Sequence, residues 1–124
     1  MVIGNGVDII EIDRISEIIK KNPRFLERCF TESERALFLE KGMKIETIAA
    51  GFAGKEAVSK ALGTGIRGFN LVDIEILRDA LGKPVVHLLG KAKDVALNKQ
   101  IHRIELSLSH SDLQAIAFAI SLSE

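Results

Sequence analysis

The chain has 124 residues, of which 47% are hydrophobic, and its 17 Lys and Arg residues balance 17 Asp and Glu residues. A chain of this length has the size of one domain, so we expect a single domain over residues 1–124 with its own core. The zero net charge gives no reason to expect general nucleic-acid binding. The single cysteine, Cys29, excludes an intrachain disulfide framework and is typical of a reducing compartment.

No apolar run is long enough to span a bilayer, and the first residues lack the pattern of a signal peptide, so we expect a cytoplasmic protein. The first predicted element is a strand over residues 2–12, where apolar residues at both parities indicate burial on both faces. Asp8 interrupts this run at a position where an apolar side chain is expected. Asp8 could cap the following helix, but Asp13 is the better candidate because it directly precedes the helical stripe of residues 14–21.

Two short helices are predicted next. Pro23 can open a helix that runs through Phe30, since proline is tolerated at the first helical position. Thr31 and Glu34 form a capping box for the following helix, and Gly42 marks its end. The first two helices carry three arginines that form either a solvated face or a docking surface for an acidic partner: Arg14, Arg24 and Arg28.

The longest predicted helix covers residues 46–62, which contain no proline and many strong helix formers. Glu56 lies near the middle of its apolar stripe, so a carboxylate is predicted on the buried face. Lys60 follows one turn later on the same side of the helix. A buried carboxylate requires a partner, which is either Lys60 in a structural ion pair or a metal ion.

A glycine-rich turn over residues 63–68 follows this helix and matches the pattern G-x-G-x-x-G. We reject it as a dinucleotide fingerprint, because that motif must follow a strand and open a helix. The turn is either a plain helix stop or a phosphate-binding turn, since glycine backbone can approach phosphate closely.

The sequence pattern of the remaining chain predicts a hairpin (residues 72–78 and 84–89), a helix (91–99) and a second hairpin (101–110 and 113–122). On the last strand, large apolar residues alternate with alanines, which indicates cover on both sides. Helices would cover one side, and more of the chain or another subunit would cover the other. His110 ends the apolar row of its strand, where a lone histidine is usually structural.

The sequence contains neither a zinc-binding cluster nor a nucleophile elbow nor a P-loop. Two carboxylates, Asp8 and Glu56, instead occupy positions that are predicted to be buried, with Lys60 and the glycine turn nearby. Oxygen ligands of this kind suit Mg²⁺ that is shared with a phosphate ligand.

Several segments together resemble one known family over nearly the whole chain and in the same order: GVDIIEIDRI, FTESE, FAGKEAVSKALGTGI, DIEI, GKPVV and LSLSHS. They are similar to the holo-acyl-carrier-protein synthase family, small bacterial 4′-phosphopantetheinyl transferases of fatty-acid synthesis. The pairing of an early G-V-D with F-A-x-K-E-A-x-x-K is highly specific. The resemblance implies an α+β fold in which a small antiparallel sheet packs against helices, one of them long and central.

The resemblance also implies an activity, the transfer of 4′-phosphopantetheine from coenzyme A to a serine of apo acyl carrier protein with release of 3′,5′-ADP. Asp8 and Glu56 would bind Mg²⁺, with Mn²⁺ as an alternative, and Lys60 would hold the coenzyme phosphates. The turn at Gly63 and Gly65 would lie against the nucleotide. The general base stays open among Glu56, another carboxylate and a metal-bound water.

Two further phosphate contacts depend on the same resemblance. His110 of the S-H-S segment would contact a coenzyme A phosphate. The family commonly has arginine directly before the phenylalanine of F-A-x-K-E-A, but this chain has Gly51 there. The missing contact would be supplied by another residue, with Lys44 and Arg67 as the candidates.

The family assembles three protomers with coenzyme A between neighbours, which would explain an apolar second face on the last hairpin. Its acidic carrier protein would dock on Arg14 and Arg24, with Arg28 contributing less. The main competing hypothesis is a non-catalytic oligomer that binds coenzyme A or a nucleotide, and a purely structural α+β domain is the third. Retention of Asp8, Glu56 and Lys60 together favours the enzyme.

Overall fold

A computed structural model describes all 124 residues of the chain. Its helices and strands confirm the predicted α+β class and the order of the elements. In chain order they are β1 (Val2–Glu11), α1 (Ile12–Lys21), α2 (Phe25–Cys29), α3 (Glu32–Glu40), α4 (Ile45–Ala61), a 3-10 turn η1 (Leu71–Asp73), β2 (Ile74–Arg78), β3 (Pro84–Leu88), α5 (Gly90–Asn98), β4 (Arg103–His110) and β5 (Gln114–Leu122).

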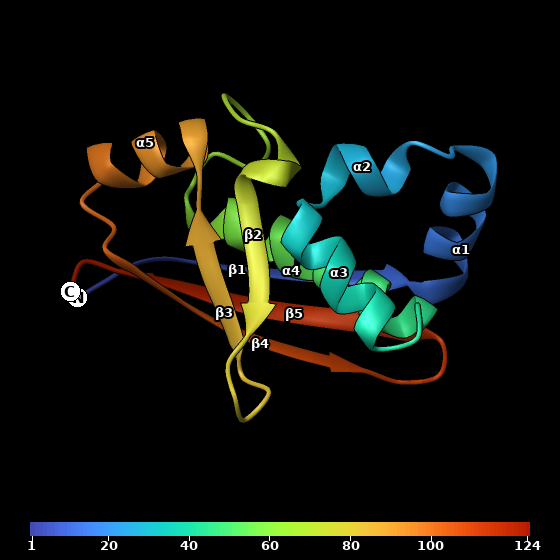
Figure 1. The fold of residues 1–124 in the computed structure, drawn as a ribbon. Helices are drawn as coiled ribbons and strands as arrows, with labels where there is room; N and C mark the ends of the chain where they lie inside the picture. Colours follow the sequence, from blue (N-terminus) through green and yellow to red (C-terminus); the bar gives the residue numbers. More distant parts are fainter.

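The strands form two antiparallel sheets. The larger has the order β1-β5-β4, and the smaller is the predicted hairpin of β2 and β3. Figure 1 shows α1 and α2 at one end of the larger sheet, and α5 and both chain termini at the other. Because β5 lies between the first strand and β4, residues from the two ends of the sequence share one surface.

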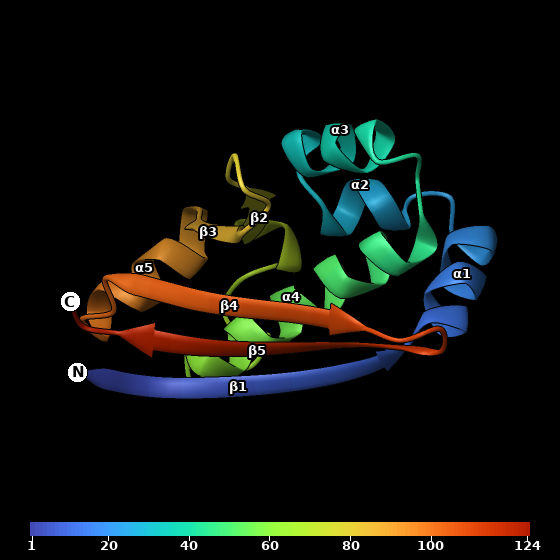
Figure 2. The ribbon, with the colours of Figure 1, turned by 90° about the horizontal axis from the view of Figure 1, so that it is seen from below.

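The long central helix α4 packs on one face of the larger sheet. Three alanines of β5 point at the helix and are almost completely buried, namely Ala115, Ala117 and Ala119. Their small side chains let the helix lie close to the strand. Figure 2 shows the three strands side by side, with α4 along them.

The opposite face of this sheet is not covered by any part of the chain. Val7 pairs with Phe118 and Ile9 with Ile116, and these four apolar side chains are 41–57% exposed. The predicted burial of the first strand on both faces is therefore wrong for the single chain. The apolar residues of β1 lie on both of its faces, of which the inner one packs against α4 and the outer one is exposed.

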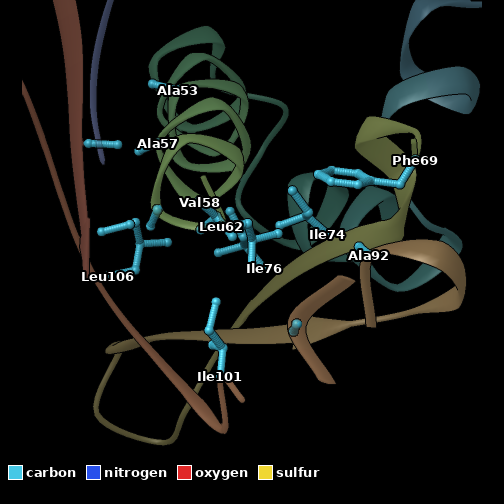
Figure 3. Packing of buried hydrophobic residues seen from close by; sticks show 14 residues of the cluster. Ala53, Ala57, Val58, Leu62, Phe69, Ile74, Ile76, Ala92, Ile101 and Leu106 are labelled. Atoms are coloured by element: carbon cyan, nitrogen blue, oxygen red, sulfur yellow. The ribbon is translucent and has the colours of Figure 1, made fainter. Parts of the chain in front are cut away.

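The core extends from α4 to the small sheet of β2 and β3 and to α5. Figure 3 shows Leu106 of β4, Ile76 of β2 and Ile101 converging on Val58 and Leu62 at the C-terminal end of the central helix. The small sheet thereby packs against the same helix as the large one. None of the helices is both long and apolar enough to cross a membrane.

Local signals in the first helices were partly misleading. The capping box of Thr31 and Glu34 is confirmed, with both of its hydrogen bonds present. The predicted cap at Asp13 is wrong, because α1 already begins at Ile12 and has no side-chain cap. Asp13 lies in the first turn instead, where a negative charge favours the helix dipole. Pro23 does not open a helix, since α2 starts two residues later, at Phe25.

Candidate active site

Asp8, Glu56 and Lys60 meet where β1 crosses the C-terminal half of α4. The Lys60 ammonium donates hydrogen bonds to Asp8 Oδ1 at 3.3 Å and to the Val7 carbonyl oxygen at 2.8 Å. Glu56 lies one turn earlier on the helix, close enough for the charge of Asp8 to affect its pKa. The structure thus brings together the three residues that the sequence pointed to.

A glycine allows the strand to approach the helix this closely. A Cβ at Gly6 would lie 2.7 Å from the Lys60 Cβ and nearer still to the Ala57 carbonyl oxygen. Residues two apart on a strand share a face, so Gly6 and Asp8 both point at α4. Any larger side chain at Gly6 would push Asp8 away from Glu56. Helical and strand periodicity contained no signal for this contact, because it joins residues about fifty positions apart.

The two carboxylates repel each other. Burial raises the pKa of Glu56, the charge of Asp8 raises it further, and the charge of Lys60 lowers it in part. Lys60 is half exposed, with 49% of its side chain open to solvent, and its ammonium pairs with Asp8. The negative charge on this surface is therefore only partly compensated by the chain.

The donor set fits a magnesium ion. The structure contains no group of three or more His, Cys, Asp or Glu side chains that could hold a metal alone. Mg²⁺ does not need such a cage, because it commonly takes one or two carboxylates and fills its other positions with water and substrate phosphate. Asp8 and Glu56 offer the oxygen ligands of that arrangement, and Lys60 offers a positive charge for the phosphate.

The helical pattern predicted that Glu56 lies on a buried stripe of α4. In the structure, Glu56 does not lie on the buried side of this helix. The helix is buried on most of its circumference, and only a few positions remain partly exposed. Glu56 is one of these positions, together with Ile45, Phe52 and the exposed Lys60. Ile45 and Phe52, which were counted in a core stripe, are thus on a less buried side of the helix, where a ligand can reach the carboxylate, whereas Ile48 and Ala49 of the same stripe are fully buried.

The charge that is fully buried on this helix is the neighbouring Lys55, which sequence reasoning missed. Its ammonium contacts Glu34 Oε1 at 2.7 Å, and both side chains are at most 1% exposed. Lys55 also donates to the carbonyl oxygens of Leu71 and Ile74. Glu34 Oε2 accepts the backbone N–H of Ile76 at 2.9 Å. The capping box was the one signal in the sequence for this ion pair, because a capping glutamate beside the core can also accept a hydrogen bond from a lysine.

The turn after α4 has a backbone conformation that favours glycine. Gly63 and Gly65 adopt positive φ angles of 84° and 59°, which side chains other than glycine rarely adopt. Lys99 donates to the Leu62 carbonyl oxygen at 2.8 Å and so ties the turn to the end of α5. The turn begins three residues after Lys60, next to the site.

Lys44 and His110 lie apart from this site within the chain. Lys44 precedes the first residue of α4, about 24 Å along the helix axis from Lys60. His110 ends β4 and lines a separate pocket that also contains Lys41 and Arg78. None of Asp8, Glu56 and Lys60 lines that pocket. Within the chain, Asp8, Glu56 and Lys60 thus form one group, His110 belongs to a second, and Lys44 belongs to neither.

Gly51, where the family commonly has arginine, does not border either group of residues. A Cβ at Gly51 would contact the rings of Phe30 and Phe38 at 3.5 Å. A hollow of about 460 Å³ lies between β3, α5 and β4, and no predicted site residue lines it. The three arginines of the first helices are all exposed, but acidic residues are interspersed with them: Asp13, Glu17 and Glu27.

Comparison with known proteins agrees with this geometry. The 4′-phosphopantetheinyl transferase superfamily matches residues 4–119, so the chain belongs to that family. The holo-[acyl-carrier-protein] synthase of Alkaliphilus oremlandii is 52% identical over 122 residues, covering 98% of this chain and 100% of the relative.

Solved structures extend the similarity to the fold. An acyl carrier protein synthase of Plasmodium yoelii with ADP bound superposes with a TM-score of 0.92 at 35% identity, over 100% of this chain and 97% of the other. The Helicobacter pylori holo-[acyl-carrier-protein] synthase in complex with coenzyme A has a TM-score of 0.84 at 34% identity, over 95% and 99% of the chains.

Proposed function

We propose that this protein transfers 4′-phosphopantetheine from coenzyme A to a serine of apo acyl carrier protein, in fatty-acid biosynthesis. The serine oxygen forms a bond to the β-phosphorus of coenzyme A, the bond from that phosphorus to the bridging oxygen breaks, and 3′,5′-ADP leaves. The serine hydroxyl gives its proton to a general base, for which Glu56 or another carboxylate is the candidate on this chain. The observation that carries the proposal is the meeting of Asp8, Glu56 and Lys60 in a chain that belongs to the transferase superfamily.

Asp8 and Glu56 would hold Mg²⁺, with Mn²⁺ as an alternative. When bound, the cation would supply a positive charge against the coenzyme diphosphate and would offset the negative charge that develops there. Lys60 then leaves Asp8 and binds the same phosphates, because its half-exposed ammonium can rotate toward solvent. The glycine turn at Gly63 and Gly65 would lie against the nucleotide, and its lack of side chains permits close backbone approach.

We further propose that three protomers assemble through the open face of the large sheet. This face carries an exposed apolar patch that association would bury. The patch consists of the pairs Val7 with Phe118 and Ile9 with Ile116. Coenzyme A would then lie between neighbours, with its diphosphate at Lys60 of one protomer and another phosphate at His110 of the next. This arrangement explains why the two groups of residues do not meet within one chain.

The carrier protein would dock on the first helices. Arg14, Arg24 and Arg28 are exposed there and can attract an acidic partner, which increases the rate of encounter at low salt. We propose the cytoplasm as the compartment, since the reaction needs intracellular coenzyme A and the single Cys29 forms no disulfide.

Intact-mass spectrometry of apo acyl carrier protein tests this function. The carrier is incubated with the protein, coenzyme A and Mg²⁺, and a parallel sample contains a chelator. We expect a gain of one phosphopantetheine group that the chelator abolishes. If coenzyme A binds but no group is transferred, the result favours the non-catalytic binding oligomer or a different carrier protein.

A mixture of two inactive variants tests the shared site. Glu56→Gln removes the diphosphate centre and His110→Ala weakens the second pocket, and each homotrimer should lose activity. After mixing and subunit exchange, some interfaces combine two intact halves, so activity should return. Mixtures that stay inactive despite proven exchange would place the whole site on one protomer.

A further inference from the structure

Arg78 contains the one buried side-chain nitrogen or oxygen in the structure that has no hydrogen-bond partner. Its Nη1 is shielded from solvent and contacts no acceptor. Arg78 ends β2 on the face that also carries Ile74 and Ile76, both of them buried. The guanidinium thus lies where the strand pattern would place another apolar side chain. Buried polar groups in folded proteins nearly always have partners, so this exception requires an explanation.

The pocket beside Arg78 has an excess of positive charge. Lys41 at the end of α3 and His110 at the end of β4 line it together with Arg78. Glu46 is the only carboxylate in the lining, and no ion pair joins it to any of these three side chains. Ser109 and Thr47 add hydroxyl groups. The lining therefore offers several donors and positive charges to an anion.

A structural role does not account for Arg78. Burial lowers the pKa of its guanidinium, but an arginine side chain stays charged in proteins. A charge that is held partly out of water without a partner destabilises the fold. An anion in the pocket would remove this cost, because the planar guanidinium can donate two parallel hydrogen bonds to a phosphate group.

We propose that Arg78 binds the phosphate monoester of the coenzyme donor, together with Lys41 and His110. This inference rests on the proposed function, in which Asp8, Glu56 and Lys60 take the diphosphate. Coenzyme A has only one other phosphate, the 3′-phosphate of its ribose, and that group remains for the second pocket. Arg78 is thus a specificity residue that distinguishes coenzyme A from 3′-dephospho-coenzyme A.

Calorimetric titration of the full-length protein with both donors, in the presence of Mg²⁺, tests the assignment. The variant Arg78→Met keeps the aliphatic stem and removes the charge. Arg103→Met is a matched control, because Arg103 is an exposed strand arginine that lines neither site. The wild-type protein and the control should prefer coenzyme A by about 10-fold to 100-fold, as expected for charged hydrogen bonds.

In Arg78→Met this preference should fall to about twofold or less, while the affinity for 3′-dephospho-coenzyme A stays unchanged. The midpoint of thermal unfolding without ligand should stay the same or rise. A wild-type preference that persists in the variant would overturn the role of Arg78 and leave the proposed function intact. Equal loss of affinity for both donors, with a lower midpoint, would identify a structural role. If the wild-type protein binds neither donor, both the inference and the proposed function are wrong.

Discussion

Lys55 and Glu56 are neighbours in sequence, yet they belong to two regions of opposite character. Lys55 lies inside the protein, where Glu34 and two carbonyl oxygens accept its hydrogen bonds. Glu56 lies half-buried beside Asp8, with burial and the like charge both raising its pKa. The first region is electrostatically satisfied by the chain. The second is not, and it can be satisfied by a ligand.

This difference separates a folding role from a binding role on one helix. The Lys55 region joins α3, α4 and β2, because Glu34 also accepts the backbone N–H groups of Thr31 and Ile76. The Glu56 region joins only α4 and the edge strand β1. We therefore expect substitutions in the first region to change the free energy of unfolding, and substitutions in the second to change transfer.

The largest expected effect is the loss of transfer in Glu56→Gln. The amide removes one of two anionic ligands for the cation, so we expect kcat to fall by about 10²–10³-fold or more. Steady-state formation of holo carrier protein measures this change. Glu40→Gln is the matched control, since Glu40 is exposed at the end of α3 and outside both sites. Near-normal kcat in Glu56→Gln would contradict the metal assignment.

The next effect is a loss of stability in Lys55→Met. Removing the lysine leaves the Glu34 carboxylate buried and without its cation, which typically costs about 3–5 kcal/mol. Urea unfolding followed by circular dichroism gives the free energy of unfolding. The double variant Glu34→Leu/Lys55→Met should recover part of that loss, because no unpaired charge remains. A single variant as stable as the wild-type protein would show that the pair does not hold α3, α4 and β2 together.

Gly6→Ala should affect both stability and transfer, because it forces β1 away from the central helix. The added methyl group meets the Ala57 carbonyl oxygen and the Lys60 side chain, which should cost about 1–3 kcal/mol. Transfer should fall as well, since Asp8 moves away from Glu56. Gly51→Ala is a matched control on α4, where the new methyl makes only ordinary contacts and alanine favours the helix. Equal stability of the two variants would contradict the tight packing of β1.

The smallest effect concerns carrier docking, which should depend on neither region of α4. Arg14→Gln should raise the KM for the carrier protein by about threefold at low salt and leave kcat unchanged. Added salt should reduce the difference between the variant and the wild-type protein. Arg103→Gln serves as the control for a general loss of positive charge. The docking assignment fails if the two variants show the same KM at all salt concentrations.

Elements that are encoded by neighbouring residues were predictable from the sequence. The capping box at Thr31, the long central helix and both hairpins depend on contacts within a few residues, and all are present. Asp13 was misassigned because α1 begins one residue before it and has no side-chain cap. The open face of β1 could not be inferred either, since an apolar pattern does not distinguish burial within a chain from a surface left for another protomer.

The site was predictable in part. Asp8, Glu56 and Lys60 were singled out from the residue pattern, the resemblance added their roles, and the structure places the three residues together. The Lys55 and Glu34 pair and the unpartnered Arg78 were missed, because each depends on packing between elements that are distant in sequence. The helical pattern of α4 placed Glu56 on the buried side because it counted Phe52 and Ile45 as core residues. Both are only partly buried.

The free energy of unfolding of Glu56→Gln, measured at pH 7 without metal or coenzyme, tests the central claim most directly. The account predicts a value equal to or higher than that of the wild-type protein. The reason is that the neutral amide removes the repulsion from Asp8 that raises the pKa of Glu56. A decrease of several kcal/mol, like the one expected for Lys55→Met, would show that Glu56 also serves the fold and would contradict the separation of the two regions.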